Sequence, residues 1–307
     1  MNAIHLARVS KRFGSHLAVD DLSLDVPAGS VYGFIGPNGS GKTTTLRMIL
    51  HILLPDSGHI EVFGDPRTDI ARDKIGYLPE ERGLYKKMKV RRLLRYYGEL
   101  KGRSRKFVDS EINRWIDQMS LGGWLDRPVE TLSKGMAQKV QFIAAVISRP
   151  DLLILDEPFS GLDPVNADVL RDAIRTIRQQ GTTILFSTHD MNVAERMCDR
   201  IFMIFRGRKV LDGTLDEIQS AYGSDTVRVK IEGSPAVLDS LPGVVSVNDF
   251  GQLQEVRLAG DPQLLLAALV ARARVRHFEV TRPSLHDIFV RIAKPTPEEL
   301  EQEAIRA

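Results

Sequence analysis

The segment Gly36–Thr43 places the tightest constraint on how this chain can fold. Its sequence, Gly-Pro-Asn-Gly-Ser-Gly-Lys-Thr, fits the pattern G-x-x-x-x-G-K-[ST]. The apolar run Val31–Ile35 precedes it, and residues 43–50 have the apolar spacing of a helix. A strand, a glycine-rich loop and a helix in this order predict a phosphate-binding loop, whose backbone N–H groups converge on phosphate oxygens at a helix N-terminus.

Two side chains of this loop add chemistry that its glycines lack. Lys42 would reach the β and γ phosphates of a nucleotide, and the Thr43 hydroxyl would ligate Mg²⁺. The loop therefore predicts a nucleotide site with an associated metal ion. We expect the nucleotide contacts of the loop to be Gly36, Asn38, Gly39, Ser40, Gly41, Lys42, Thr43 and Thr44.

A second apolar strand, Leu152–Leu155, runs directly into two carboxylates, Asp156 and Glu157. At the carboxyl edge of a parallel sheet, Asp156 would hold the Mg²⁺ shell and Glu157 would take a proton from an attacking water. Alone, such a strand end is equally compatible with a structural role. After a phosphate loop, it indicates hydrolysis.

The pattern of apolar residues predicts two domains in the 307 residues. In the first, residues 1–222, an antiparallel strand pair is followed by alternating strands and helices, which imply a parallel sheet, and residues 88–150 are mostly helical. The second, residues 223–292, has the order strand, helix, strand, strand, helix, strand of a ferredoxin-like α+β unit. Residues 293–307 form an acidic tail.

Charge and cysteine content narrow the class of protein. The 42 basic and 40 acidic residues give a net charge of +2, which excludes a wholly basic nucleic-acid coat. The single cysteine, Cys198, and an N-terminus without a signal-peptide pattern predict a cytosolic chain. No apolar run approaches the roughly 20 residues that a membrane span needs, so a partner chain would have to supply any span.

The small net charge hides a strongly basic segment at residues 86–106. It contains ten lysines and arginines against one acid, Glu99, which is +9, and the remainder of the chain is therefore −7. A solvated helix face is the plain interpretation, and a charge density this high also suggests a partner.

Three more segments complete a familiar set: Thr131–Met136 (TLSKGM), Ser160–Asp163 (SGLD) and Ser187–Asp190 (STHD). With the phosphate loop and the Asp-Glu strand, they resemble, in order, the motifs of the ATP-binding subunit of ABC transporters. The resemblance covers roughly residues 3–220. It implies a P-loop NTPase core with an antiparallel β subdomain and a helical subdomain, and ATP with Mg²⁺ as the cofactors.

The resemblance also implies roles for individual residues. Phe13 would stack on adenine, and its alternative is core packing. Ser133 and Gly135 would close over the γ-phosphate of ATP bound to a second subunit, with Asp163 among the nucleotide contacts. His189 would sense the γ-phosphate and orient the water.

Two positions depart from the family's pattern. Glu80 stands where the family usually has glutamine, and we expect it to ligate Mg²⁺ or orient water. Lys134 replaces the usual glycine at the second residue of the signature. We expect activity to survive because Ser133 and Gly135 remain.

We therefore predict an ATP-hydrolysing subunit that forms a homodimer with a second ATP-binding subunit. It would pair with a separate transmembrane permease, on the cytoplasmic face of the membrane. The signature and the C-terminal extension resemble those of the sodium, drug, peptide or polysaccharide exporters.

The basic segment would then face the permease and anionic headgroups. The other interpretation of that segment is contact with nucleic acid through Tyr96 and Tyr97, which lie among its basic residues. We do not expect a nucleic-acid partner. The alternatives for the whole chain are a soluble ABC-type ATPase of DNA repair or translation and an inactive scaffold.

Overall fold

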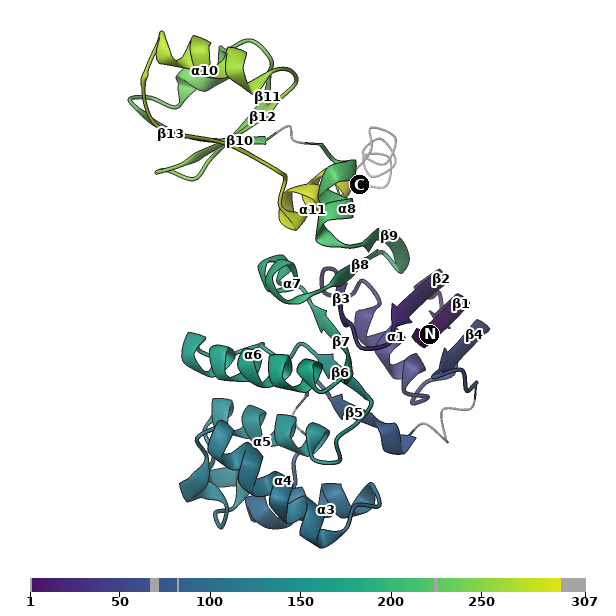
Figure 1. Cartoon of the computed structure of the whole chain (residues 1–307). Coiled ribbons are helices and arrows are strands. Elements are labelled where there is room, and N and C mark those ends of the chain that lie inside the picture. The colour runs from purple at the N-terminus through teal and green to yellow at the C-terminus, as the bar shows by residue number, and fades with distance from the viewer. Residues whose placement is uncertain (1, 67–71, 82, 224–225, 294–307) are drawn as a thin grey trace. The chain divides into compact units, whose positions relative to one another are not determined.

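The computed structural model describes residues 2–66, 72–81, 83–223 and 226–293 (Figure 1). Residues 294–307 of the predicted acidic tail lie outside this range. Contacts between residues divide the chain into two units, Met1–Asp212 and Gly213–Ala307. The division falls before the boundary expected at residue 222, because helix α8 (Leu215–Ala221) bonds within the second unit: Gln219 Nε2 donates to the Pro283 carbonyl at 3.0 Å.

A six-stranded sheet organises the first unit, in the order β5-β6-β7-β3-β8-β9. Its strands are β3 (Val31–Ile35), β5 (Ile75–Leu78), β6 (Leu152–Asp156), β7 (Thr183–Thr188), β8 (Arg200–Phe205) and β9 (Arg208–Gly213). The pairings from β5 to β8 are parallel. The carboxyl ends of β3, β6 and β7 therefore meet at one edge of the sheet, which is where open α/β sheets bind ligands.

A smaller antiparallel sheet, in the order β2-β1-β4, lies in the same unit. It consists of β1 (Asn2–Phe13), β2 (His16–Pro27) and β4 (Ser57–Val62). The predicted N-terminal strand pair is thus confirmed. Alternate apolar side chains such as Leu6, Leu22 and Leu24 face a core that this sheet shares with Phe34 and Phe202 of the parallel sheet.

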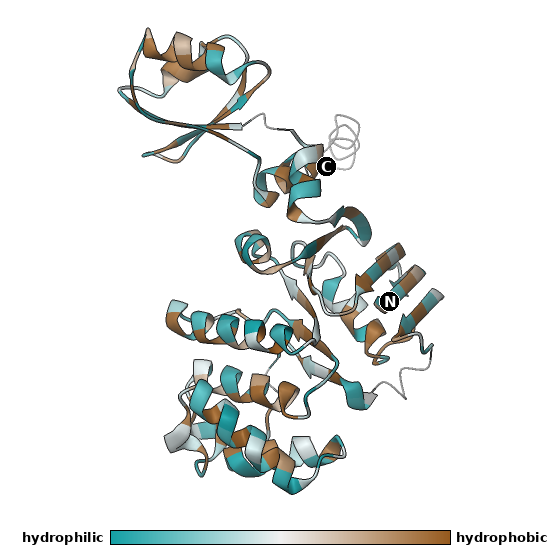
Figure 2. Ribbon diagram, viewed as in Figure 1, coloured by the Kyte–Doolittle hydropathy of each residue, from teal (hydrophilic) through white to brown (hydrophobic). Residues whose placement is uncertain are grey.

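The helices of the first unit carry their apolar residues on one side. They are α1 (Lys42–Ile49), α3 (Val90–Leu100), α4 (Arg105–Gln118), α5 (Lys134–Val146), α6 (Pro164–Gln179) and α7 (Met191–Met197), with 3₁₀ turns at Arg72–Lys74, Gly122–Trp124 and Val129–Thr131. Helix α6 buries Leu170, Ala173, Ile174 and Ile177, a helical period, and its other residues are mainly hydrophilic (Figure 2). Trp115 of α4 meets Phe142 of α5 edge to face in the core beneath α3 to α6.

One hydrogen bond ties the central strand of the sheet to its edge. The Tyr32 hydroxyl of β3 donates to Asp212 Oδ1 of β9 at 2.6 Å. Tyr32 is completely buried. Strand β3, which leads into the phosphate loop, is therefore fixed to the last residue of the first unit.

The second unit has the predicted ferredoxin-like topology. After α8 come β10 (Thr226–Glu232), α9 (Ala236–Asp239), β11 (Val244–Asp249), β12 (Gln254–Leu258), α10 (Pro262–Val270), β13 (Arg274–Thr281) and α11 (Leu285–Ala293). The four strands form an antiparallel sheet in the order β11-β12-β10-β13. Leu238 of α9 and Leu265 and Leu269 of α10 pack on Val227, Val229 and Val256 of this sheet.

None of the helices in the described ranges combines the length and hydropathy needed to cross a lipid bilayer.

Candidate functional site

Glycines shape the phosphate loop because other residues would collide there. Gly41 caps α1 with a φ of +107°, and a β-carbon at this position would lie 2.5 Å from the Ala18 carbonyl oxygen. A β-carbon at Gly36 would lie 2.2 Å from the Ile204 carbonyl oxygen. The backbone of the loop can therefore follow this path only with glycine at both positions.

A pocket of about 340 Å³ lies over the loop. It gathers residues from β1, β2, the loop, α1, the segment after β5 and the end of β6. Its lining includes most of the predicted nucleotide contacts: Phe13, Asn38, Gly39, Gly41, Lys42, Thr43, Thr44, Glu80 and Glu157, together with His16 and Ala18. Gly36 and Ser40 belong to the loop but do not line the pocket.

Lys42 is buried within the loop and is surrounded by oxygen atoms. Its Nζ donates to the carbonyls of Gly36 at 2.7 Å and Pro37 at 3.0 Å, and lies 3.9 Å from Glu157 Oε1. Burial lowers the pKa of Lys42, whereas the carboxylates of Glu157, Asp156 and Glu80 act in the opposite direction. The ammonium thus lies where phosphate oxygens can compete for it.

Asp156 is the last residue of β6, and only one of its two carboxylate oxygens is hydrogen-bonded. Ser187 Oγ donates to Oδ1 at 2.5 Å, and Thr43 Oγ1 lies 3.5 Å from the same atom. Oδ2 is buried and has no hydrogen-bond partner in the described part of the chain. A buried carboxylate oxygen without a donor is costly, and a hydrated cation beside Thr43 would satisfy it. The residues present therefore fit a Mg²⁺ ion.

Glu157 follows directly and contacts the histidine at the end of the neighbouring strand. Its Oε1 lies 2.9 Å from His189 Nδ1. Its backbone N–H donates to the Ser187 carbonyl, and its φ of +49° is rare for a residue with a side chain. Glu157 is almost fully buried, whereas about half of the His189 side chain is exposed.

Two predicted contacts lie at the entrance of the pocket. Phe13 is 47% exposed, and Lys11 Nζ lies 5.7 Å from the centroid of its ring. A side chain this exposed does not pack in the core, so the core-packing alternative for Phe13 is wrong. Glu80 also lines the pocket, two residues after β5 ends.

Ser133, Gly135 and Asp163 do not line this pocket. Ser133 caps α5, where its Oγ accepts from the Met136 N–H at 3.3 Å, and Asp163 caps α6, where its Oδ1 accepts from the Asn166 N–H at 3.0 Å. The hydrogen bonds from the Asn166 backbone and side chain lower the pKa of Asp163. A β-carbon at Gly135 would lie 3.0 Å from Asn166 Nδ2, so the starts of α5 and α6 adjoin.

Three residues at the site were missed from the sequence. His16 and Ala18 reach the pocket because β2 folds back on β1, and their closeness to Phe13 in sequence was the only signal. Ser187 bonds to Asp156 because β7 pairs with β6. Its position two residues before His189 could have indicated it.

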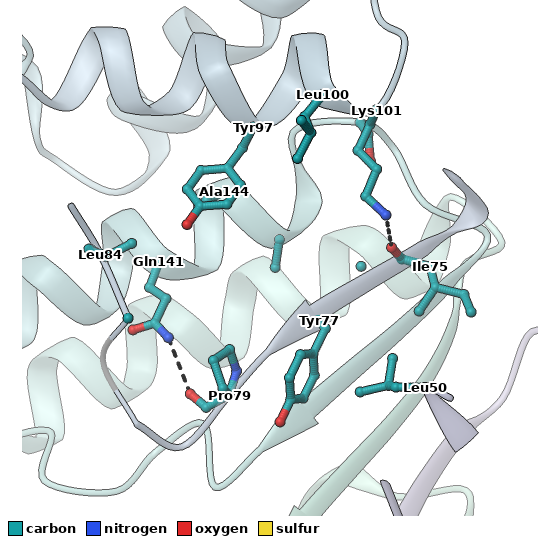
Figure 3. Close-up of a pocket in the computed structure, with 14 residues that line it drawn as sticks. Leu50, Ile75, Tyr77, Pro79, Leu84, Tyr97, Leu100, Lys101, Gln141 and Ala144 are labelled. Carbon is teal, nitrogen blue, oxygen red and sulfur yellow. Dashed lines mark hydrogen bonds between the residues drawn. The ribbon is translucent and has the colours of Figure 1, made fainter. Parts of the chain in front are cut away.

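A second, largely apolar pocket of about 360 Å³ is lined in part by Pro79 and Gly83, which lie on either side of Glu80 in the sequence (Figure 3). We call it the groove. Figure 3 shows Tyr77 and Leu50 on one side and Tyr97 and Leu100 on the other. Its lining is Leu50, Ile75, Gly76, Tyr77, Pro79, Gly83, Leu84, Tyr97, Leu100, Lys101, Gln141, Ala144, Ala145 and Ser148.

Polar bonds hold the two walls of the groove together. Gln141 Nε2 of α5 donates to the carbonyls of Pro79 at 3.3 Å and Glu81 at 3.2 Å. Lys101 Nζ donates to the Ile75 carbonyl at 3.1 Å. The segment that places Glu80 in the nucleotide pocket is thus hydrogen-bonded to Gln141, which lines the groove. This segment therefore connects the two pockets.

The basic segment at residues 86–106 is partly neutralised by its surroundings. Arg95 makes two hydrogen bonds to Asp109, of 2.6 and 3.0 Å, and Arg91 Nε lies 3.4 Å from Asp126 Oδ1. Tyr96 stacks edge to face on Tyr85 and Tyr97. Within this segment, six basic side chains make no ion pair or hydrogen bond to the described residues: Lys86, Lys87, Lys89, Arg92, Arg105 and Lys106.

Comparisons with known proteins bear on both units. The family model described as ABC transporter matches residues 19–160, and the model of the C-terminal domain of DrrA1-3-like ATP-binding proteins matches residues 213–293. An uncharacterised ABC transporter ATP-binding protein of Bacillus subtilis is 42% identical over 284 residues, which is 92% of this chain and 95% of that protein. A Nod factor export ATP-binding protein I of Burkholderia lata is 35% identical over 94% of this chain and 96% of its own. A solved ATP-binding subunit of an ABC transporter, 30% identical, superposes with a TM-score of 0.68 over 72% of this chain and 93% of that one.

Proposed function

Because the chain belongs to the family of ABC transporter ATP-binding proteins, we propose that it powers an exporter through the ATP-driven association of two copies. Members of this family are ATPases that couple hydrolysis to transport. The observation that carries the proposal is the convergence of Lys42, Glu157 and His189 at one edge of the parallel sheet. A soluble ATPase of DNA repair or translation is not favoured, because the relatives are named as transporter subunits.

In the proposed reaction, ATP binds with its phosphates on the loop. Lys42 exchanges its carbonyl partners for the β and γ phosphate oxygens, and the α1 N-terminus adds its partial positive charge. Phe13, at the exposed edge of the pocket, is positioned to stack on the base. Binding is thus dominated by the loop, and its main effect is to fix the γ-phosphate in place.

Glu157 acts as the general base in this proposal. Both Lys42 and His189 approach its Oε1, so Oε2 is left to accept the proton of the attacking water. With Glu157 ionised, His189 Nδ1–H donates to it and Nε2 is the acceptor that faces outward. His189 is then a positioning residue that fixes the carboxylate.

Thr43, Asp156 and Glu80 are the residues that would hold Mg²⁺. The unpartnered Oδ2 of Asp156 and the nearby Thr43 hydroxyl supply an anionic and a neutral oxygen, which suit a hard cation. When bound, the ion would supply positive charge that offsets the negative charge developing during phosphoryl transfer.

The second copy completes the site. Ser133, Gly135 and Asp163 lie outside the pocket of their own chain, and we propose that they contact a nucleotide held by another copy. A head-to-tail pair would enclose two ATP molecules, and hydrolysis would release the pair. We propose that the first unit, Met1–Asp212, binds ATP and that the second unit supports or regulates the pair.

The permease would dock at the groove and at the basic segment beside it. The groove is largely apolar, is lined by residues next to Glu80 in the sequence, and includes the exposed Leu100. Movement of a permease helix there would reach the nucleotide pocket through the Gln141 bonds. We propose a peripheral location on the cytoplasmic face of the membrane, and export because Nod factor export proteins are among the relatives.

ATP turnover by Glu157→Gln tests the enzymatic part of the proposal. We expect hydrolysis to fall about 100- to 1,000-fold while ATP affinity is retained, because only the proton acceptor is lost. Glu99→Gln, at an exposed carboxylate away from the pocket, is the matched control and should hydrolyse at the parent rate. Unchanged hydrolysis by Glu157→Gln would refute the assignment of Glu157 as the base.

A further inference from the structure

Another cavity of the first unit, of about 490 Å³, shares no lining residue with the nucleotide pocket. We call it the basal cavity. Helix α4 supplies Glu111, Arg114 and Trp115 to its lining, and residues 149–151 and 180–182 line it from the segments that follow α5 and α6. These two segments lead directly into β6 and β7. The basal cavity is therefore at the amino ends of these parallel strands, whereas the phosphate loop is at the carboxyl edge of the sheet.

Two arginines in the basal cavity share one buried carboxylate. Arg149 Nη2 donates to Glu111 Oε1 at 2.6 Å, and Arg114 Nη1 donates to Glu111 Oε2 at 3.5 Å. Glu111 is only 2% exposed. A guanidinium has several N–H donors, and among the described residues these two have no other hydrogen-bond acceptor. Most of their donors are therefore available to a ligand.

The charges that line the basal cavity do not cancel. Its other acid, Asp151, has its Oδ2 3.9 Å from Lys74 Nζ, so this charge is matched by a lysine that does not line the cavity. Arg114 and Arg149 then carry two positive charges against the single negative charge of Glu111. The excess of one positive charge favours a ligand with one negative charge.

Aromatic rings hold both guanidinium groups in place. Arg114 Cζ lies 5.0 Å from the centroid of the Trp115 ring, and Arg149 Cζ lies 5.3 Å from the centroid of the Phe107 ring. The hydrogen-bond donors are thus ordered before a ligand arrives, which lowers the entropy cost of binding.

Trp115 gives an independent indication that an acceptor is missing. It lines the basal cavity and is only 1% exposed, and its Nε1–H has no hydrogen-bond partner among the described residues. A buried N–H without an acceptor is costly. The indole and the two guanidinium groups need the same kind of partner, which is an oxygen that accepts hydrogen bonds.

We propose that the basal cavity binds a small organic carboxylate, whose oxygens accept hydrogen bonds from Arg114, Arg149 and the Trp115 indole. Guanidinium groups bind planar carboxylates in a bidentate manner, and the single excess charge fits a monoanion better than a phosphate dianion. The buried side chains of Val146 and Ile177 also line the cavity and would contact the apolar part of the molecule. This site does not depend on the proposed function, because the nucleotide pocket has a separate lining.

The fluorescence of Trp115 reports binding at the site itself. The sequence contains two tryptophans, so the full chain with Trp124→Phe has Trp115 as its only indole. The probe is benzoate, and benzamide, which has a similar shape and no charge, is the matched control ligand. We expect a saturable change in fluorescence with benzoate up to about 10 mM, which detects a millimolar dissociation constant. Benzamide should leave the fluorescence unchanged.

Two substitutions in this background should shift the affinity for benzoate in opposite directions. Arg114→Gln removes a charged donor and should weaken binding about tenfold. Glu111→Gln removes the negative charge that competes with the ligand and should strengthen binding about tenfold. A cluster of ion pairs with only a structural role would not give this gain.

Arg175→Gln is the matched control variant. Arg175 Nη1 lies 3.3 Å from Oδ1 of Asp172, an acid three residues earlier on the same helix, as Glu111 is to Arg114, but Arg175 does not line the basal cavity. This variant should bind benzoate like its parent. Circular dichroism verifies that each variant is folded.

Several results would overturn the site. The first is a parent with no saturable response to benzoate, or with an equal response to benzamide. The second is undiminished binding by Arg114→Gln, or an equal loss in Arg175→Gln. The third is a folded Glu111→Gln variant that binds benzoate more weakly than the parent. If Glu111→Gln does not fold, Arg114→Gln and the comparison of the two ligands still decide the question.

Discussion

His189 Nδ1 lies 2.9 Å from Glu157 Oε1, and Lys42 Nζ approaches the same oxygen at 3.9 Å. The two partners come from the end of β7 and from the phosphate loop, so one carboxylate oxygen joins two elements that are distant in sequence. In the proposed mechanism this leaves Oε2 with a fixed direction. The histidine therefore matters for geometry, and the lysine links the base to the phosphates.

Replacement of His189 by alanine should slow hydrolysis without weakening ATP binding. The carboxylate would lose its nearest donor and its fixed orientation, so we expect turnover to fall about 100-fold. Single-turnover hydrolysis and fluorescent-nucleotide binding measure the two effects separately. His189→Asn, whose amide can still donate, should recover part of the rate. A parallel loss of ATP affinity would instead indicate that His189 mainly binds nucleotide.

Asp156→Asn should abolish the benefit of Mg²⁺ for ATP binding. The substitution keeps the shape of the side chain but removes the anionic charge near Thr43. We expect ATP affinity in Mg²⁺ to fall about 10- to 100-fold, and affinity in EDTA to stay at the parent level. Titrations of ATP with and without Mg²⁺ would measure both. Equal losses in the two conditions would argue that Asp156 is structural.

Neutralising exposed charges of the basic segment should weaken binding to anionic membranes. Lys86, Lys87 and Arg92 have no ion pair in the described ranges, so replacing them by glutamine removes charge without breaking a bond. At about 1 kcal/mol each, the triple variant should bind phosphatidylserine vesicles about 100-fold more weakly. Sedimentation with neutral vesicles is the control. Unaltered binding to the anionic vesicles would count against a membrane-facing segment.

Arg95→Gln is the informative comparison for that experiment. Arg95 is joined to Asp109 by two hydrogen bonds, so its loss leaves Asp109 without its partner. We expect this variant to lower the unfolding temperature, and the triple variant to leave it unchanged. The two variants therefore separate a surface charge from a structural ion pair.

The second unit should be less stable at higher pH because of Glu255. Burial and the neighbouring Asp287 raise the pKa of Glu255, while Arg228 opposes the shift. The folded state thus binds more protons than the unfolded state above the ordinary glutamate pKa, so stability falls as pH rises through the raised pKa. Glu255→Gln should reduce this dependence, as followed by thermal unfolding between pH 5 and pH 8. A pH dependence identical to that of the parent would contradict this.

The sequence predicted local features of this protein well. In the loop at residues 36–43, the neighbours of Gly36 and Gly41 leave no room for a β-carbon, and the contiguous motif contains both glycines. The order of strands and helices likewise follows from apolar periodicity, including the ferredoxin-like second unit.

Features that depend on pairing between distant segments could not be predicted in the same way. Ser187 reaches Asp156 only through the register of β6 with β7. The basic segment was expected to carry +9, but Asp109 and Asp126, which lie outside it, neutralise part of that charge. Neither relationship can be predicted from the composition of a short segment.

The hydrogen bond between Tyr32 and Asp212 gives the chain a mechanical property. Asp212 is the last residue of the first unit, and Gly213 is the first of the second. Tension applied to the linker would therefore load β3 directly through this bond, and the phosphate loop begins one residue after β3 ends. The strand that leads into the phosphate loop is thus a point of attachment for the chain that enters the second unit, in addition to the pairing of β9 with β8.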